Sequence, residues 1–143
     1  ACFLASIAKE VVTYEIREDF IEVVNKNIDF LNLKNIKVKK KNIYEEVDDK
    51  DVDVVVLDVP EPWKALGSCS KALKPGGFLV SYSPSIPQVA DFVNALKQNE
   101  NFVYLKTCEI TEREWEVEER KVRPKSAAIG HSGFMSFARK VTR

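Results

Sequence analysis

The chain has 143 residues, of which 45% are hydrophobic and 31% charged, a composition typical of one soluble globular domain. Its 22 basic and 22 acidic residues cancel, so net charge gives no support for nucleic-acid binding, although a local basic face remains compatible with it. Three cysteines and one histidine are too few for a disulfide framework or a His-ligated metal site. Because the sequence has no signal peptide and no apolar run of about 18 residues, we expect a cytoplasmic protein.

The first part of the chain alternates predicted helices and strands. Residues 1–9 resemble the interior of a short buried helix, and the β-branched residues of 11–16 predict a strand. Apolar residues of segment 18–31 recur on one helical face. Residues 35–39 alternate with a period of two, as in a half-exposed strand, and the acidic segment 42–51 is predicted to be a loop.

The stretch from Val52 to Asp58 is a run of mostly β-branched apolar residues that ends in a carboxylate. Such a run predicts a strand buried on both faces, and Pro60 and Pro62 require the chain to leave the sheet soon afterwards. In an open α/β sheet, ligands bind beyond the carboxyl ends of the strands, where Asp58 is expected. The alternative is that Asp58 only caps a turn or the next helix.

The remaining elements continue the alternation. We expect helices over 63–73 and 88–98, a turn at Lys74–Gly77, and strands over 78–82, 102–110 and 133–141. The last two strands are joined by a charged segment without an obvious helix, which suggests one antiparallel strand inserted at the edge. The predicted fold is therefore α/β, with a mostly parallel, doubly wound sheet and an antiparallel edge strand. This Rossmann-like arrangement resembles the class I S-adenosylmethionine-dependent methyltransferases.

Four stretches together resemble one family, the tRNA (adenine-N1)-methyltransferases that modify adenosine 58 in the T-loop. They are Tyr14–Phe20, Leu57–Trp63, Leu73–Phe78 running on to Tyr82-Ser83-Pro84 and Gln88-Val89, and Arg123-Pro124 followed by Gly130–Phe134. A Lys-Pro-Gly-Gly turn occurs across many methyltransferases. The Asp-x-Pro-x-Pro-Trp stretch, with Arg-Pro and His-Ser-Gly-Phe downstream, is more restrictive. The resemblance covers essentially the whole chain and is archaeal in style.

The resemblance implies S-adenosylmethionine as cofactor, tRNA as substrate and a homotetrameric assembly, with no metal and no membrane. Members of the family carry an N-terminal β-rich domain, then a Gly-rich loop after the first strand that holds the cofactor. Because this chain starts just after the expected place of that loop, we expect residues 1–143 to be the C-terminal part of the catalytic domain. The strands over 11–16 and 52–58 would then each expose an unpaired apolar edge. The chain alone would be poorly stable or self-associated, and inactive.

The resemblance also assigns cofactor contacts to five residues. Glu15 ends the second strand of the expected fold, where a carboxylate can accept hydrogen bonds from both ribose hydroxyls. Phe20 would pack beside the cofactor, with a place in the helix core as the alternative. Asn42, before Ile43, stands where the family usually has an aspartate that contacts the adenine, and an amide oxygen can still accept from an amine. Asp58 is included among the cofactor contacts.

Asp58 is also the main catalytic candidate, with Tyr82 beside it. Methylation of adenine N1 places a positive charge on the ring, and a carboxylate that accepts from the exocyclic amine would orient the base and stabilise that charge. Tyr82 would pack against the base or hydrogen-bond to it, or else be a core aromatic residue.

Several assignments stay open in the sequence. His131 either acts on the base or RNA or fixes a turn before the last strand. The basic run from Arg120 to Lys125 can meet phosphates, but neighbouring glutamates offset its charge, so a solvated surface or a subunit contact is an equal alternative. The alternatives for the whole chain are another class I methyltransferase or a non-catalytic tRNA-binding or assembly subunit. Whether adenosine 57 is also methylated is not encoded in any motif.

Overall fold

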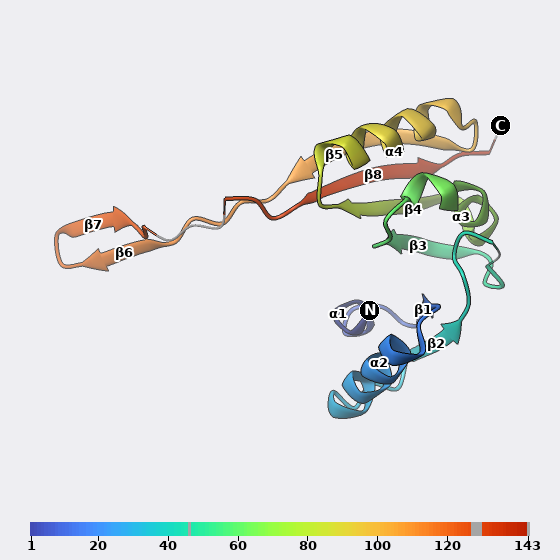
Figure 1. Cartoon of the computed structure of the whole chain (residues 1–143), viewed down its shortest axis with the longest axis horizontal. Helices are drawn as coiled ribbons and strands as arrows, with labels where there is room; N and C mark the ends of the chain where they lie inside the picture. The colour runs from blue at the N-terminus through green and yellow to red at the C-terminus, as the bar shows by residue number, and fades with distance from the viewer. Residues whose placement is uncertain (46, 127–129, 143) are drawn as a thin grey trace. The chain divides into compact units, whose positions relative to one another are not determined.

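The computed structural model describes residues 1–45, 47–126 and 130–142. They form two compact units, Ala1–Asp48 and Asp49–Arg143, each with parallel strands and helices (Figure 1). The loop predicted over 42–51 includes residue 46, which lies outside the described residues. No helix in the described part of the chain is both long and apolar enough to cross a membrane.

The first unit is built around one parallel strand pair. Its elements are α1 (Cys2–Ala5), β1 (Val11–Glu15), α2 (Glu18–Phe30) and β2 (Ile36–Lys40). β1 and β2 pair in parallel from Val11 opposite Ile36 to Glu15 opposite Lys40. Two acidic residues in the first turn of α2 interact favourably with the helix dipole, as the predicted helix over 18–31 requires.

The helix at the start of the chain is shorter and more exposed than predicted. It ends at Ala5, because the Ser6 hydroxyl donates to the Phe3 carbonyl and competes with the helical pattern. The prediction of a buried helix is wrong, since only Ala5 in it is buried. The Asn35 side chain then donates to the carbonyls of Ala5 (2.8 Å) and Ala8 (2.9 Å), which ties this turn to the start of β2.

The second unit contains a four-stranded sheet, two α-helices and a separate hairpin. Its elements in chain order are β3 (Val52–Leu57), the 3-10 helix η1 (Pro62–Ala65), α3 (Leu66–Ala72), β4 (Leu73–Ser83), α4 (Ile86–Gln98), β5 (Phe102–Glu109), β6 (Trp115–Glu118), β7 (Lys121–Pro124) and β8 (Phe134–Lys140). The sheet has the order β3-β4-β8-β5, with β3 parallel to β4 and β8 antiparallel to both of its neighbours.

The antiparallel strand is present as predicted, but it does not lie at the edge. β8 is inserted between β4 and β5, and β5 takes the edge. The small residues Ser136 and Ala138 of β8 are fully buried beneath α4, which packs on β5 and β8. Small side chains on an inner strand leave room for the helix, a requirement that strand order in the sequence does not reveal.

β3 is less buried than predicted. The prediction that both faces of this strand are buried is wrong, because the side chains of Val54 and Val56 are 50% and 46% exposed. The physical reason is that β3 pairs with β4 alone, so in its own unit it is an edge strand. Among the described residues β1 likewise pairs only with β2, and both strands have the unpaired edges that the sequence predicts.

The Lys-Pro-Gly-Gly segment forms an irregular bulge in place of a free turn. Leu73 and Phe78 of β4 face β3 residues that are only two positions apart, so the residues between them bulge out of the ladder. Gly76 has a φ of +78°, and a Cβ on Gly77 would lie 2.9 Å from the Lys74 carbonyl oxygen. Glycine is thus required at both positions.

The core of the second unit lies between the sheet and its helices. Its most buried large side chains are Leu57, Leu73, Leu79, Phe92 and Leu96. Cys69 is fully buried among them, and burial raises the pKa of its thiol to about 12. At the C-terminus of α3, the Lys140 ammonium donates to the carbonyl of the C-cap residue Leu73 at 2.6 Å.

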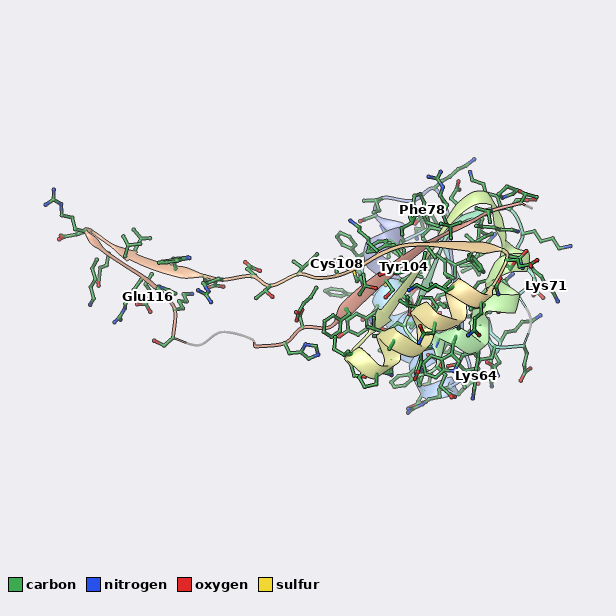
Figure 2. The ribbon with its side chains drawn as sticks, turned by 90° about the horizontal axis from the view of Figure 1, so that it is seen from above. Lys64, Lys71, Phe78, Tyr104, Cys108 and Glu116 are labelled. Atoms are coloured by element: carbon green, nitrogen blue, oxygen red, sulfur yellow. The ribbon has the colours of Figure 1, made fainter. Side chains whose placement is uncertain are left out.

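The charged segment over 112–125 folds into a hairpin that the sequence analysis did not predict. β6 and β7 pair in antiparallel fashion, and every residue of both strands is exposed. Figure 2 shows that no helix or other described strand of the second unit covers them. The pattern is present in the sequence, since apolar and charged residues alternate on each side of Glu119, whose φ is 53°.

Candidate active site

Asp58 and Tyr82 lie next to each other because two parallel strands end at the same level. The last paired residues of β3 and β4 are Leu57 and Ser81, and Asp58 and Tyr82 each follow directly. Both side chains line a hollow of about 290 Å³ in the second unit, together with Val59, Pro60, Pro84 and Gln88. The structure thus brings together the two residues predicted to be catalytic.

The Asp58 carboxylate is exposed and makes no hydrogen bond or ion pair within the described residues. It does not cap the next helix, because η1 begins at Pro62 with Glu61 as its N-cap residue and without a side-chain cap. The capping alternative is therefore not seen. A carboxylate with no partner among these residues is available to accept hydrogen bonds from a ligand in the hollow.

The opposite wall of this hollow is held by Gln88 of α4. The Gln88 amide donates to the Pro60 carbonyl at 3.1 Å, and its own oxygen accepts from the Ser85 hydroxyl at 2.7 Å. The two prolines of the Asp-x-Pro-x-Pro stretch lack N–H groups, so side chains of neighbouring elements must fix this loop. Sequence reasoning gave Gln88 no role, although it lies in one of the four stretches that carry the family resemblance.

The segment that leads into β8 holds the Tyr82 side chain in place. Its hydroxyl donates to the Ser132 carbonyl at 2.7 Å, and the Ser132 hydroxyl donates to the Ile110 carbonyl at 3.0 Å. Gly133 has a φ of +128°, and a Cβ there would lie 2.4 Å from a ring carbon of Tyr82. Only glycine fits under the ring, which explains the His-Ser-Gly order.

We expect Gly133→Ala to lower the free energy of unfolding by about 1–3 kcal/mol, because the strained φ and the clash with Tyr82 act together. Gly130→Ala is the matched control, since a Cβ at Gly130 meets nothing within 4 Å. Urea denaturation of both variants measures the difference. Equal stability of the two variants would contradict the close packing of Gly133 on Tyr82.

His131 connects two loops at this edge of the sheet. Its Nε2 lies 2.6 Å from the Pro84 carbonyl oxygen and its Nδ1 lies 3.3 Å from Glu109 Oε1. The ring is also tilted against Phe134, with centroids 5.2 Å apart. The hydrogen bond to Pro84, followed by the one to Glu109, raises the pKa of His131. His131 does not line the hollow, although Pro84 does.

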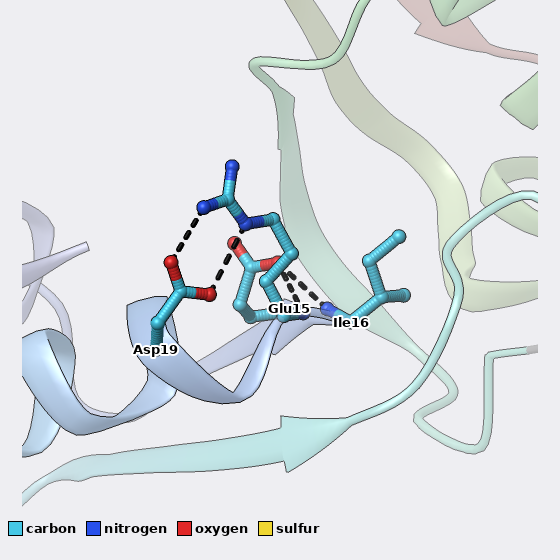
Figure 3. A network of polar contacts seen from close by, with 4 residues as sticks. Glu15, Ile16 and Asp19 are labelled. Carbon is cyan, nitrogen blue, oxygen red and sulfur yellow. Dashed lines mark hydrogen bonds and ion pairs between the residues drawn. The ribbon is translucent and has the colours of Figure 1, made fainter.

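In the first unit, Glu15 sits where β1 gives way to α2 (Figure 3). Its Oε1 accepts from the backbone N–H groups of Ile16 (2.7 Å) and Arg17 (2.8 Å), which fixes the direction of the carboxylate. Its Oε2 accepts no hydrogen bond within the described residues, although the carboxylate interacts electrostatically with the Arg17 guanidinium. Beside it is a hollow of about 390 Å³ lined by Ile16, Lys40, Lys41, Asn42 and Glu45. One oxygen therefore holds the turn and the other is available to a ligand.

The other three residues of the predicted cofactor set lie in the same unit. The Asn42 Oδ1 accepts from the Tyr44 N–H, and its Nδ2 donates to Glu45, both at 3.0 Å, so its oxygen keeps one free lone pair. Ile43 follows in the same turn and is half-buried. Phe20 is exposed, so it is not a core residue, and the Arg17 guanidinium lies 3.9 Å from its ring centroid.

No group of three or more possible metal ligands occurs among residues 1–45, 47–126 and 130–142.

Comparison with known proteins decides the family. The profile of a family described as "tRNA methyltransferase complex GCD14 subunit" matches residues 9–132 of this chain. The chain belongs to this family. A curated GCD14-like relative, the tRNA (adenine(57)-N(1)/adenine(58)-N(1))-methyltransferase TrmI of Methanocaldococcus jannaschii, is 37% identical over 157 residues. The match covers 91% of this chain and 55% of the relative.

Solved structures support the same assignment. The chain superposes on the tRNA (m1A58) methyltransferase TrmI of Aquifex aeolicus with a TM-score of 0.90 and 27% identity, covering 98% of this chain and 57% of the other. It also superposes on a SAM-dependent O-methyltransferase of Thermotoga maritima with a TM-score of 0.89 and 32% identity, covering 94% of this chain and 51% of the other. The predicted class I methyltransferase fold is confirmed. This GCD14-family chain spans about half the length of the curated relatives it matches.

Proposed function

We propose that this chain is part of an S-adenosylmethionine-dependent methyltransferase that methylates N1 of adenosine 58 in the T-loop of tRNA. The observation that carries the proposal is the carboxylate of Asp58, which has no partner within the described residues and lies beside Tyr82 at the strand ends, within the Asp-x-Pro-x-Pro-Trp stretch. Membership in the GCD14 family and the printed activity of the M. jannaschii relative support the choice of tRNA.

The residues of the first unit fit the proposed cofactor. The free Oε2 of Glu15 is suited to ribose hydroxyls, and the remaining lone pair of Asn42 Oδ1 is suited to the adenine amine. Ile43 and the exposed ring of Phe20 offer apolar contact to the same ligand. When bound, S-adenosylmethionine supplies an electrophilic methyl group on a sulfonium centre.

Asp58 acts on the target base. Adenine N1 already has a lone pair, so no proton has to leave before it attacks. As the methyl group transfers, positive charge develops on the ring, and a carboxylate that accepts from the exocyclic amine stabilises that charge. Asp58 is free to do so, and the Tyr82 ring, fixed by Ser132, forms the neighbouring wall of the hollow. The base has to leave the folded tRNA to reach it.

Two other functions compete with this one. A related class I methyltransferase with another substrate would keep the same cofactor residues, and an assembly subunit would keep the fold without turnover. Nucleoside mass spectrometry of bulk tRNA from cells that lack the gene tests the substrate, because loss of 1-methyladenosine at position 58 supports the proposal. Unchanged 1-methyladenosine would contradict it. The same map reports on adenosine 57. Failure of an Asp58→Ala gene to restore the modification then separates the enzyme from an assembly subunit, which would not need this carboxylate.

We further propose that the full-length protein works in the cytoplasm as a homo-oligomer, a tetramer by family resemblance, with the β6–β7 hairpin in a subunit contact. One hairpin face is apolar, with Trp115 opposite Pro124 and Val117 opposite Val122. On the other face Arg123 pairs with Glu116 at 2.9 Å, and Lys125 pairs with Glu114. Cations that are already paired have less to offer to phosphates, which favours a protein partner over RNA.

Trp115→Asp in the full-length protein is expected to weaken self-association by about 30-fold or more, since losing a central aromatic contact costs about 2 kcal/mol or more. Trp115, Val117 and Val122 are 53%, 72% and 56% exposed, so the change does not disturb a core. Glu118→Gln, on the charged face, is the control. Analytical ultracentrifugation that finds the same assembly for both variants would exclude the hairpin from the contact.

A further inference from the structure

Residues His131, Ser132 and Gly133, here called the clasp, join three separate ends of the sheet beside the proposed base site. His131 reaches Pro84 beyond β4 and Glu109 at the end of β5. Ser132 accepts from Tyr82, and its hydroxyl bonds to the carbonyl of Ile110. Tyr82 and Pro84 line the hollow, while no clasp residue does. The clasp therefore acts on the hollow through the residues that it holds.

The partners of the His131 ring fix its protonation state. The Pro84 carbonyl oxygen, 2.6 Å from Nε2, can only accept a hydrogen bond. A carboxylate oxygen of Glu109 lies 3.3 Å from Nδ1 and accepts a hydrogen bond from a ring N–H there. A neutral imidazole has one N–H and would turn a lone pair toward one of these oxygens. Both contacts are satisfied only when both ring nitrogens carry a proton.

We propose that His131 is a positioning residue that, as an imidazolium, holds Pro84 and Tyr82, which line the hollow, in place for the target base. This inference rests on the proposed function for its role in methyl transfer, but its hydrogen bonds can be tested alone. The titratable side chains that contact the clasp within the described residues are Glu109 of β5 and Tyr82 of β4, and its contact with β8 is the uncharged ring of Phe134. The other titratable groups of these strands, Lys74, Tyr104, Lys106, Cys108, Arg139 and Lys140, make no hydrogen bond to it.

The sign of the pH dependence follows from the direction of the shift. Contact with Pro84 and Glu109 raises the pKa of His131 above its ordinary value of about 6.5. The clasp is then fully formed below that ordinary value and is lost as pH rises through the raised pKa. Methyl transfer should fall over the same range, because a misplaced wall of the site costs up to about 100-fold in rate.

Nuclear magnetic resonance of the full-length protein tests the clasp directly. With histidine ring nitrogens and tyrosine rings isotope-labelled, and with the His131 and Tyr82 signals assigned from His131→Gln and Tyr82→Phe, we expect both His131 nitrogens to be protonated in mildly acidic solution. The Tyr82 signal should shift with the midpoint of the His131 titration, and Glu109→Gln should lower that midpoint. The proposal would be overturned if the His131 ring were neutral at a pH below its ordinary pKa, or if the Tyr82 signal did not change as His131 titrates.

Kinetics supply the second readout. Glu109→Gln should move the alkaline fall of kcat to lower pH, and His131→Gln, which keeps one donor for Pro84, should lower kcat and remove this fall. Cofactor affinity should not change in either variant. An alkaline limb that is unchanged in His131→Gln would refute the positioning role. If the wild-type protein does not methylate tRNA, the proposed function fails, whereas the resonance titration still decides whether the clasp exists.

Discussion

Asp58→Ala in the full-length protein is expected to reduce methyl transfer to tRNA by about 100-fold or more, since one charge-stabilising group in a site is typically worth that much. The structure gives Asp58 no other task, because its carboxylate has no partner within the described residues and caps no helix. Stability should therefore stay close to that of the wild type. Single-turnover methylation of a tRNA transcript is the measurement.

Two further variants sharpen the Asp58 experiment. Asp58→Asn keeps an acceptor oxygen but loses the charge, so an effect as large as that of alanine would assign the loss to electrostatics. Asp91→Ala removes an exposed carboxylate from α4 in the same unit and should leave the rate unchanged. Near-normal turnover by Asp58→Ala would remove Asp58 from the chemistry. A large loss of cofactor affinity would instead make it a binding residue.

Glu15→Ala is expected to weaken S-adenosylmethionine binding by roughly 1.5–3 kcal/mol, the scale of hydrogen bonds to a charged group. That corresponds to about 10–150-fold in dissociation constant. Oε1 of Glu15 already serves the N–H groups of Ile16 and Arg17, so the loss is attributed to Oε2. Isothermal titration calorimetry on the full-length variant measures it.

The design of the Glu15 experiment has to separate binding from local folding. Glu15→Gln keeps an oxygen for the two backbone N–H groups and lacks the negative charge, so it should fold normally and still bind weakly. Glu22→Ala, an exposed carboxylate on α2, serves as the control for net charge. A dissociation constant unchanged in Glu15→Ala would reduce Glu15 to a turn-forming residue.

The sequence predicted most of the fold because its strands and helices have strong local patterns. The helix α4, with apolar residues on one face, and the strand β5 lie within two residues of their predicted bounds. The place of β8 was not predictable in the same way. Whether an antiparallel strand takes the edge or the next position depends on which strand leaves room for α4, and only three-dimensional packing decides that.

Site residues that end a strand could be predicted from the sequence. Residues that support the site by donating to a backbone carbonyl oxygen could not. Asp58 and Tyr82 were predicted as a pair from their strand ends together with the family resemblance, and the structure places them on one hollow. The hydrogen bonds of Gln88 to Pro60 and of His131 to Pro84 join segments far apart in sequence through backbone oxygens. Backbone acceptors leave no residue-type pattern, so no sequence motif reveals them.

The measurement that tests the central claim most directly is methyl transfer by the full-length protein to paired tRNA transcripts. One transcript carries adenosine at position 58 and the other carries uridine there, with a labelled methyl donor and mass-spectrometric mapping of the product. We expect 1-methyladenosine at position 58 of the first transcript, and no methyl group at that position in the second. Equal labelling of both transcripts outside position 58, or labelling of neither, would contradict this expectation.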